Sequence, residues 1–94
     1  MPVVRMTHEA ARQYLSLPLR VADEFDRIKV FLARNPVHLP PWVDVKLMGE
    51  ERGKQVFRLR VGEYRAIFTF DGEVVKFIRF RPRGNIEYGA LPKG

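Results

Sequence analysis

The stretch that decides the fold is residues 55–70, Gln-Val-Phe-Arg-Leu-Arg-Val-Gly-Glu-Tyr-Arg-Ala-Ile-Phe-Thr-Phe. Apolar and polar side chains alternate on both sides of Gly62-Glu63, as in two strands that each bury one face. A two-residue loop that contains glycine favours a hairpin between them. The pattern predicts strands from Gln55 and from Tyr64, with these side chains on the core side: Phe57, Leu59, Val61, Tyr64, Ala66, Phe68 and Phe70.

A loop at Gly62-Glu63 also sets the register of this hairpin. It pairs Arg60 with Arg65. Arg58 then lies opposite Ile67, so that three arginines share the outer face of the sheet. Like charges directly opposite each other destabilise a strand pair. The pairing of two arginines therefore indicates that an anion normally lies between them.

Downstream, Asp71-Gly72 is a second turn signal, and it precedes a last strand over residues 73–81. A two-residue loop there would pair Ile67 with Lys76. It would also pair Arg65 with Ile78. Lys76 is then predicted on the arginine face, together with three apolar residues: Val74, Ile78 and Phe80.

Upstream, the pattern changes to that of helices. A β-branched segment, residues 1–6, reads as an opening strand, and Thr7 is a suitable N-cap for a helix over residues 8–17. A second amphipathic helix begins near Val21 and stops at Asn35-Pro36. The proline-rich segment 36–42 and residues 43–49 then lead to a turn around residues 50–53. We therefore expect an α+β fold of order β-α-α-β-β-β, with the opening strand and an αα-hairpin packed on an antiparallel β-meander.

Composition limits the chain to one compact domain, residues 1–94, with 46% hydrophobic residues. The absence of cysteine and the presence of only two histidines exclude disulfides and disfavour a metal site, so we expect neither metal nor cofactor. Residues 1–5 lack the long apolar stretch of a signal peptide, and no run approaches the roughly 20 apolar residues that span a bilayer. We expect a cytoplasmic protein.

The charge favours a polyanionic partner. Seventeen Lys and Arg against eleven Asp and Glu give a net charge of +6, which suits RNA, DNA or an acidic protein. Arginine predominates, and its planar fork grips phosphate and stacks on bases, which points toward nucleic acid. The alternative explanations are a solvated basic face and the charged surface that is typical of thermophiles.

Three segments carry a family resemblance: Val-Lys-Leu-Met-Gly at 45–49, Phe-Arg-Leu-Arg-Val-Gly-Glu-Tyr-Arg-Ala-Ile-Phe at 57–68, and Arg-Gly-Asn-Ile-Glu-Tyr at 83–88. They resemble the RelE/ParE toxin superfamily, and the expected order of elements is similar to that family as well. The resemblance implies a RelE-like mRNA interferase, the toxin of a toxin-antitoxin system that cleaves mRNA on the ribosome without metal. It also implies a small acidic, RelB-like antitoxin as partner.

Carried over by position, the resemblance implies a catalytic set in which the ribose 2′-hydroxyl attacks its own phosphate and leaves a 2′,3′-cyclic phosphate. Arg60 and Arg65 would stabilise the charge that develops on the phosphate. Arg58 and Arg83 would position the phosphate, and Tyr88 would stack on a base or share in proton transfer. Further RNA contacts are expected from Lys46, Lys76 and Arg81.

Several assignments stay open. Arginine is a poor general base because it is effectively always protonated, so the base could be Tyr88, Lys46, Lys76 or, less readily, Glu63. The C-terminal site arginine could be Arg81 in place of Arg83. Two other functions are compatible with the resemblance: a ParE-like inhibitor of DNA gyrase, and an RNA-binding relative that has lost catalysis.

Overall fold

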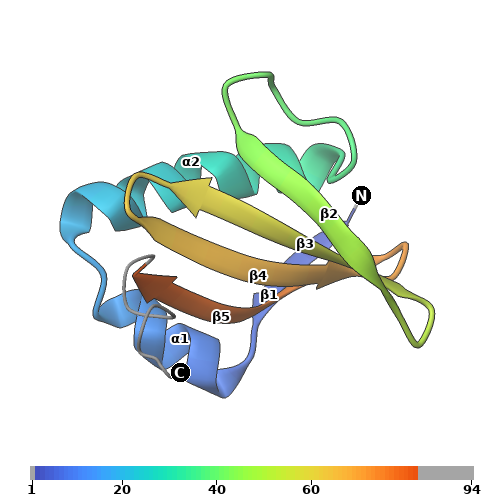
Figure 1. Cartoon of the computed structure of the whole chain (residues 1–94), viewed down its shortest axis with the longest axis horizontal. Coiled ribbons are helices and arrows are strands. Elements are labelled where there is room, and N and C mark those ends of the chain that lie inside the picture. The colour runs from blue at the N-terminus through green and yellow to red at the C-terminus, as the bar shows by residue number, and fades with distance from the viewer. Residues whose placement is uncertain (1, 83–94) are drawn as a thin grey trace.

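The computed structural model describes residues 2–82 of the chain, which form two layers (Figure 1). Five strands make one sheet in the order β1-β5-β4-β3-β2, and both helices contribute side chains to the core on one of its faces. β1 runs parallel to β5, whereas the other neighbouring strands are antiparallel. The elements are β1 (Val3–Met6), α1 (His8–Leu15), α2 (Leu19–Arg34), β2 (Asp44–Glu51), β3 (Lys54–Val61), β4 (Tyr64–Phe70) and β5 (Val74–Pro82).

This architecture confirms the predicted α+β class, with one addition. Residues 44–51, expected only to lead into a turn, form the edge strand β2, so the observed order is β-α-α-β-β-β-β. The strand was missed because its alternation is broken by a bulge at Met48, between the pairs Leu47–Phe57 and Gly49–Val56. The parallel pairing of β1 with β5 makes the sheet mixed.

The helices begin and end close to their predicted positions. Thr7 Oγ1 accepts a hydrogen bond of 3.0 Å from the backbone N–H of Ala10, as expected of an N-cap. α1 ends at Leu15, two residues before the predicted end, and Pro18 occupies the N-cap position of α2. No helix within residues 2–82 is long and apolar enough to cross a membrane.

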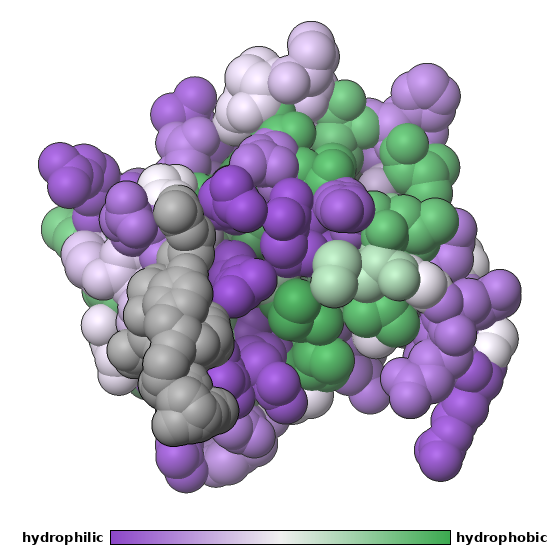
Figure 2. Space-filling model, in the orientation of Figure 1, coloured by the Kyte–Doolittle hydropathy of each residue, from purple (hydrophilic) through white to green (hydrophobic). Residues whose placement is uncertain are grey.

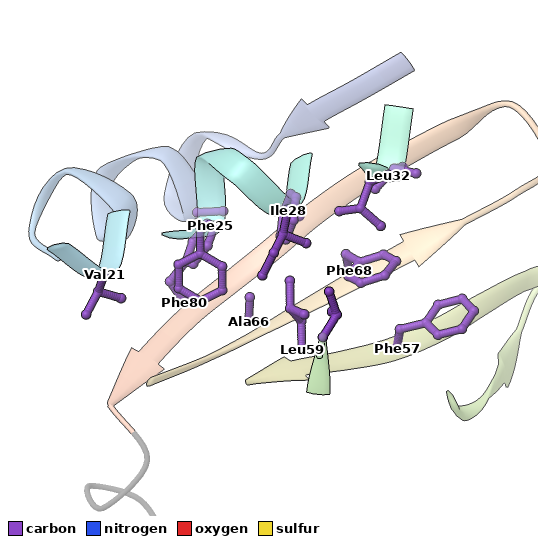
Figure 3. Close-up of a cluster of buried hydrophobic side chains, with 13 residues drawn as sticks. Val21, Phe25, Ile28, Leu32, Phe57, Leu59, Ala66, Phe68 and Phe80 are labelled. Atoms are coloured by element: carbon purple, nitrogen blue, oxygen red, sulfur yellow. The ribbon is translucent and has the colours of Figure 1, made fainter. Parts of the chain in front are cut away.

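The core lies between the helices and the sheet, as the labelled side chains in Figure 3 show. Phe68 is fully buried at its centre, where its ring stacks on Phe57 with 5.0 Å between centroids and tilts against Phe77 at 5.4 Å. The helix side of the core consists of Ala10, Val21, Phe25, Ile28 and Leu32, and the sheet side consists of Phe57, Leu59, Ala66, Phe68, Val75, Phe77 and Phe80.

The β3–β4 hairpin has the predicted register: Arg60 lies opposite Arg65, and Arg58 lies opposite Ile67. Gly62 has φ of 58°, in the left-handed region, at the first position of the two-residue loop. Glycine at this position with a negative φ at Glu63 fits a type II′ turn, whose twist matches that of the two strands. An L-residue in place of Gly62 would strain this turn.

The predicted register of β5 is wrong. Ile67 lies opposite Arg79 in place of Lys76, and Arg65 lies opposite Arg81 in place of Ile78. One cause is the loop after Phe70, which is longer than two residues because Phe70 pairs with Val75. Within this loop Asp71 Oδ1 accepts hydrogen bonds of 2.9 and 2.8 Å from the N–H groups of Glu73 and Val74.

The second cause is a bulge in β5. Phe77 pairs with Phe68 and Arg79 pairs with Ile67, so Ile78 has no partner on β4. The extra residue reverses the alternation of side chains that follows it. Phe80, expected on the arginine face, is therefore buried in the core, and Arg79 and Arg81 face away from it.

The end of β1 leaves a backbone group of β5 that a helix side chain satisfies. β1 pairs with β5 only as far as Met6–Phe77, and beyond it the N–H of Phe80 donates a 2.8 Å hydrogen bond to Gln13 Oε1 on α1. An unsatisfied buried N–H costs about 1–3 kcal/mol. Gln13→Ala is expected to lower the free energy of unfolding by about this amount in urea denaturation.

Glu9→Ala is the control for this prediction. Glu9 accepts a 3.1 Å hydrogen bond from the other end of the Gln13 amide, at an exposed position. Loss of this exposed hydrogen bond is expected to change the free energy of unfolding by no more than about 0.5 kcal/mol. Equal losses in the two variants would show that the bond to Phe80 contributes nothing of its own.

Candidate functional site

The sheet face opposite the core carries a cluster of arginines, which we call the arginine cluster: Arg58, Arg60, Arg65, Arg79 and Arg81. The strand pairing arranges it in two rows that cross β2 to β5. Figure 2 shows hydrophilic side chains gathered over the middle of the view, with hydrophobic ones beside them. One row is Asp44, Arg60, Arg65 and Arg81, and the other is Lys46, Arg58, Ile67 and Arg79.

Each position in a row is fixed by the backbone of its strand. Neighbouring strands lie about 4.8 Å apart, so Arg60, Arg65 and Arg81 stand side by side with their Cα atoms held at short spacing. Such an arrangement of like charges is unfavourable unless anions are present. A scaffold that holds guanidinium groups in this way is therefore prepared to receive an anion.

Asp44 supplies one such anion from within the chain. Its Oδ1 lies 3.2 Å from Arg58 Nη2, and its Oδ2 lies 3.8 Å from Arg60 Nη1. One carboxylate thus bridges two arginines of adjacent rows. The Arg58 side chain is 15% exposed and that of Arg60 is 35% exposed, whereas Asp44 is 51% exposed. The arginines are held firmly against the sheet, and the carboxylate that bridges them is open to solvent.

The same two arginines still have hydrogen-bonding capacity. Within residues 2–82 the buried Nε atoms of Arg58 and Arg60 have no hydrogen-bond partner. A buried donor without an acceptor is costly. Because the two Nε atoms are buried, a phosphate from solvent would bind the exposed part of each guanidinium group, to which phosphate oxygens bind in pairs.

A shallow hollow lies at the other end of the rows. It has a volume of about 180 Å³ and is lined by Arg65, Ile67, Arg79 and Arg81. Three guanidinium groups and one apolar side chain form its walls, a combination that can contact both the charged backbone and the less polar sugar or base of a nucleotide.

Most of the described residues that the sequence indicated lie together. Arg58, Arg60 and Arg65 share one face, Lys46 lies opposite Arg58, and Arg81 lies opposite Arg65. Lys76 lies apart from them, opposite Thr69. Glu63 is exposed in the β3–β4 loop. The predicted Arg83 and Tyr88 lie outside the described residues, and their roles stay predictions.

Sequence reasoning missed Asp44, and it left Arg79 open between a solvated end of the strand and the rim of the same groove. The turn at Arg52-Gly53 pairs Glu51 with Lys54, and counting back from this pair without a bulge would place Asp44 opposite Val61, on the core side. The bulge at Met48 moves it opposite Arg60. The usable signal was the sequence of residues 44–47, in which Asp44 and Lys46 alternate with Val45 and Leu47.

The described residues thus form a two-layer α+β domain with a cationic open face, and comparison with known proteins specifies the fold. No protein-family model matches the chain, and no curated protein matches its sequence. A chain in the crystal structure of the archaeal RelE-RelB complex from Pyrococcus horikoshii OT3 is similar, with a TM-score of 0.77 and 24% identity. The alignment covers 89% of this chain and 97% of that one.

A chain of the RelB-RelE antitoxin-toxin complex from Methanococcus jannaschii is similar as well. Its TM-score is 0.67 and its identity is 19%, over 83% of this chain and 88% of that one. The fold is RelE-like, as the sequence indicated.

Proposed function

We propose that this protein is the toxin of a toxin-antitoxin pair and that it cleaves mRNA on the ribosome. The observation that carries the proposal is the pair of rows on the open face, in which Arg60, Arg65 and Arg81 stand side by side. The RelE-like fold supports it, since both similar structures are complexes of RelE with RelB. The net charge of +6 is also suited to an RNA substrate.

The proposed reaction is an internal transfer within the RNA. The ribose 2′-oxygen bonds to the adjacent phosphorus as the bond from phosphorus to the 5′-oxygen breaks, and the 2′-hydroxyl proton is replaced by one on the leaving oxygen. The products are a 2′,3′-cyclic phosphate and a 5′-hydroxyl. Negative charge builds up on the phosphate oxygens in the transition state, and fixed cations lower its energy.

The roles follow from position. Arg65 lies at the centre of its row, between Arg60 and Arg81, where it can contact a phosphate from the middle of the cluster. Arg60 would share the charge, and Arg58 would hold a neighbouring phosphate oxygen. The general base is not an arginine. Among the described candidates, Lys46 lies in the second row, directly opposite Arg58.

The test is translation in a cell-free system with purified protein, followed by mapping of mRNA ends. The proposal expects cuts within codons bound to the ribosome and a 2′,3′-cyclic phosphate on the upstream fragment. Intact mRNA with normal translation would contradict it. In that case a supercoiling assay with DNA gyrase, and RNA binding without cleavage, would distinguish the two alternative functions.

The proposed partner is an acidic, RelB-like antitoxin. Charge complementarity with a chain of net charge +6 would speed its association and make the complex sensitive to salt. Coexpression with a small acidic protein encoded beside its gene is expected to give a stable heteromeric complex that suppresses cleavage. A toxin that remains fully active in the presence of that product would contradict this assignment.

Asp44 is expected to weaken RNA binding, because its carboxylate occupies part of the cluster that a phosphate would contact. Asp44→Asn removes this charge while keeping the shape of the side chain. An exposed ion pair contributes about 0.2–1 kcal/mol, so RNA affinity is expected to rise by about 1.5- to 5-fold at low salt, measured by fluorescence anisotropy. Asp23→Asn, an equal change of charge at an exposed position on α2, should have a smaller effect. Equal effects would mean that only net charge matters.

A further inference from the structure

A second cationic region lies on the same face of the sheet, toward the β4–β5 loop. Arg5 on β1 is paired with Lys76 on β5, and Lys76 is paired with Thr69 on β4. Lys54, the first residue of β3, joins them around a hollow of about 190 Å³. We call it the Lys76 hollow, and it is lined by Arg5, Lys54, Thr69, Asp71, Val74 and Lys76.

The three cations of this hollow are not neutralised by ion pairs. Within residues 2–82 no carboxylate oxygen lies within 4.0 Å of the charged groups of Arg5, Lys54 or Lys76. Arg5 and Lys76 even lie opposite each other, which is unfavourable for two like charges. The hollow therefore has a local excess of positive charge.

The acidic residue of the hollow is already engaged. Asp71 Oδ1 accepts hydrogen bonds from the N–H groups of Val74 and Glu73, and these bonds lower the pKa of Asp71. Its carboxylate therefore helps to shape the β4–β5 loop, and its single charge against three cations leaves the hollow with a net charge of +2. Thr69 adds a hydroxyl donor to the lining. Guanidinium, ammonium and hydroxyl donors together are the groups that contact RNA phosphates.

The position of the hollow relates it to the arginine cluster. Thr69 lies four residues from Arg65 on β4, on the same face, which corresponds to about 14 Å at roughly 3.4 Å per residue. Ile67 lies between them. A neighbouring hollow of about 400 Å³ shares Lys54, Thr69 and Lys76 and extends to Ile78, and its lining also includes Glu51 and Arg52, whose charges are opposite. A strand of RNA that reaches both regions would place phosphates over the cations and less polar groups over the two isoleucines.

From these observations we infer that the Lys76 hollow is a second phosphate-binding subsite, which holds the backbone of single-stranded RNA a few nucleotides from the phosphate at the arginine cluster. The inference rests on the proposed function, because it assumes that RNA occupies the arginine cluster. It goes further by joining Arg5 and Lys54 to Lys76, which was already expected as an RNA contact, and by assigning all three to binding and not to catalysis. The subsite would extend the RNA footprint along the sheet.

The experiment compares a trinucleotide with a dodecanucleotide of single-stranded RNA. Binding to the full chain is measured by anisotropy over a range of salt concentrations, for wild type and for the double variant Lys54→Gln/Lys76→Gln. Both side chains are exposed, so the variant should fold. For the dodecanucleotide we expect about tenfold weaker binding and a slope of log K against log salt that is shallower by about 1.4. Binding of the trinucleotide should be unchanged.

A matched control removes the same charge from the helix layer. Arg12→Gln/Arg34→Gln replaces two exposed arginines of α1 and α2 and should leave both RNAs bound as in wild type. Equal weakening by the two double variants, equal weakening for the two RNA lengths, or an unchanged salt slope would each overturn the subsite. None of these outcomes bears on whether the wild-type protein cleaves mRNA, which the cell-free assay measures separately. Failure of the subsite and failure of the proposed function are therefore distinguishable.

Discussion

Arg65→Ala is expected to lower the rate of mRNA cleavage by about 10²- to 10³-fold, the usual effect of removing one fixed donor from a site of charge stabilisation. Arg65 is opposite Arg60 on one side and Arg81 on the other, so its loss interrupts the row at its centre. The measurement is single-turnover cleavage on programmed ribosomes, with mRNA ends mapped by primer extension. Circular dichroism of the variant would verify that it is folded.

Two further variants separate the role of Arg65 from that of charge in general. Arg65→Lys keeps the charge but loses the planar fork that binds two phosphate oxygens, so partial activity is expected. Arg12→Ala removes an equal charge from an exposed position on α1 and should cleave at the wild-type rate. Full activity in Arg65→Ala would remove this residue from the site.

Phe68→Ala is expected to lower the free energy of unfolding by about 3–5 kcal/mol, as large-to-small changes of buried aromatic residues do. The side chain is completely buried and contacts the rings of Phe57 and Phe77. The chain around it cannot fill the space, because both neighbouring rings are held on their own strands. The total free energy of unfolding of a small domain is about 5–15 kcal/mol. The variant would therefore lose much of its stability, which urea denaturation measures.

Val30→Ala on α2 serves as the control for this effect. Val30 is 53% exposed and outside the core, so its truncation should cost no more than about 0.5 kcal/mol. Phe68→Leu should lie between the two, since it keeps part of the apolar volume. A loss in Phe68→Ala as small as that in Val30→Ala would mean that the sheet repacks around the vacated position.

The β3–β4 hairpin could be predicted in full because nothing in it interrupts the alternation. A two-residue turn with Gly62 at its first position fixes the pairing of Arg60 with Arg65, and the class of the fold follows from the apolar stripe of α2. β2 and β5 each contain an unpaired residue, Met48 and Ile78, and such residues leave no clear mark in the alternation of polar and apolar side chains.

The candidate site was predictable to the same extent as the strands that carry it. Arg58, Arg60 and Arg65 lie on the hairpin and have the predicted pairing, whereas Lys46 on β2 and Arg81 on β5 were expected as RNA contacts but without their positions in the rows. The clue in β5 was chemical: regular alternation from Phe77 would have turned Arg79 and Arg81 into the core. Burying two arginines without partners is so costly that an irregularity could have been expected there.

The unpaired Ile78 also affects how related chains are to be compared. A chain one residue shorter at this point would keep the same pairs with β4 and the same faces, whereas a chain of equal length without the bulge would have every downstream side chain of β5 on the opposite face. The position of a gap in an alignment then decides which basic residues are considered equivalent, and a misplaced gap would equate an arginine of the open face with a phenylalanine of the interior. Length at this position carries as much information as residue identity.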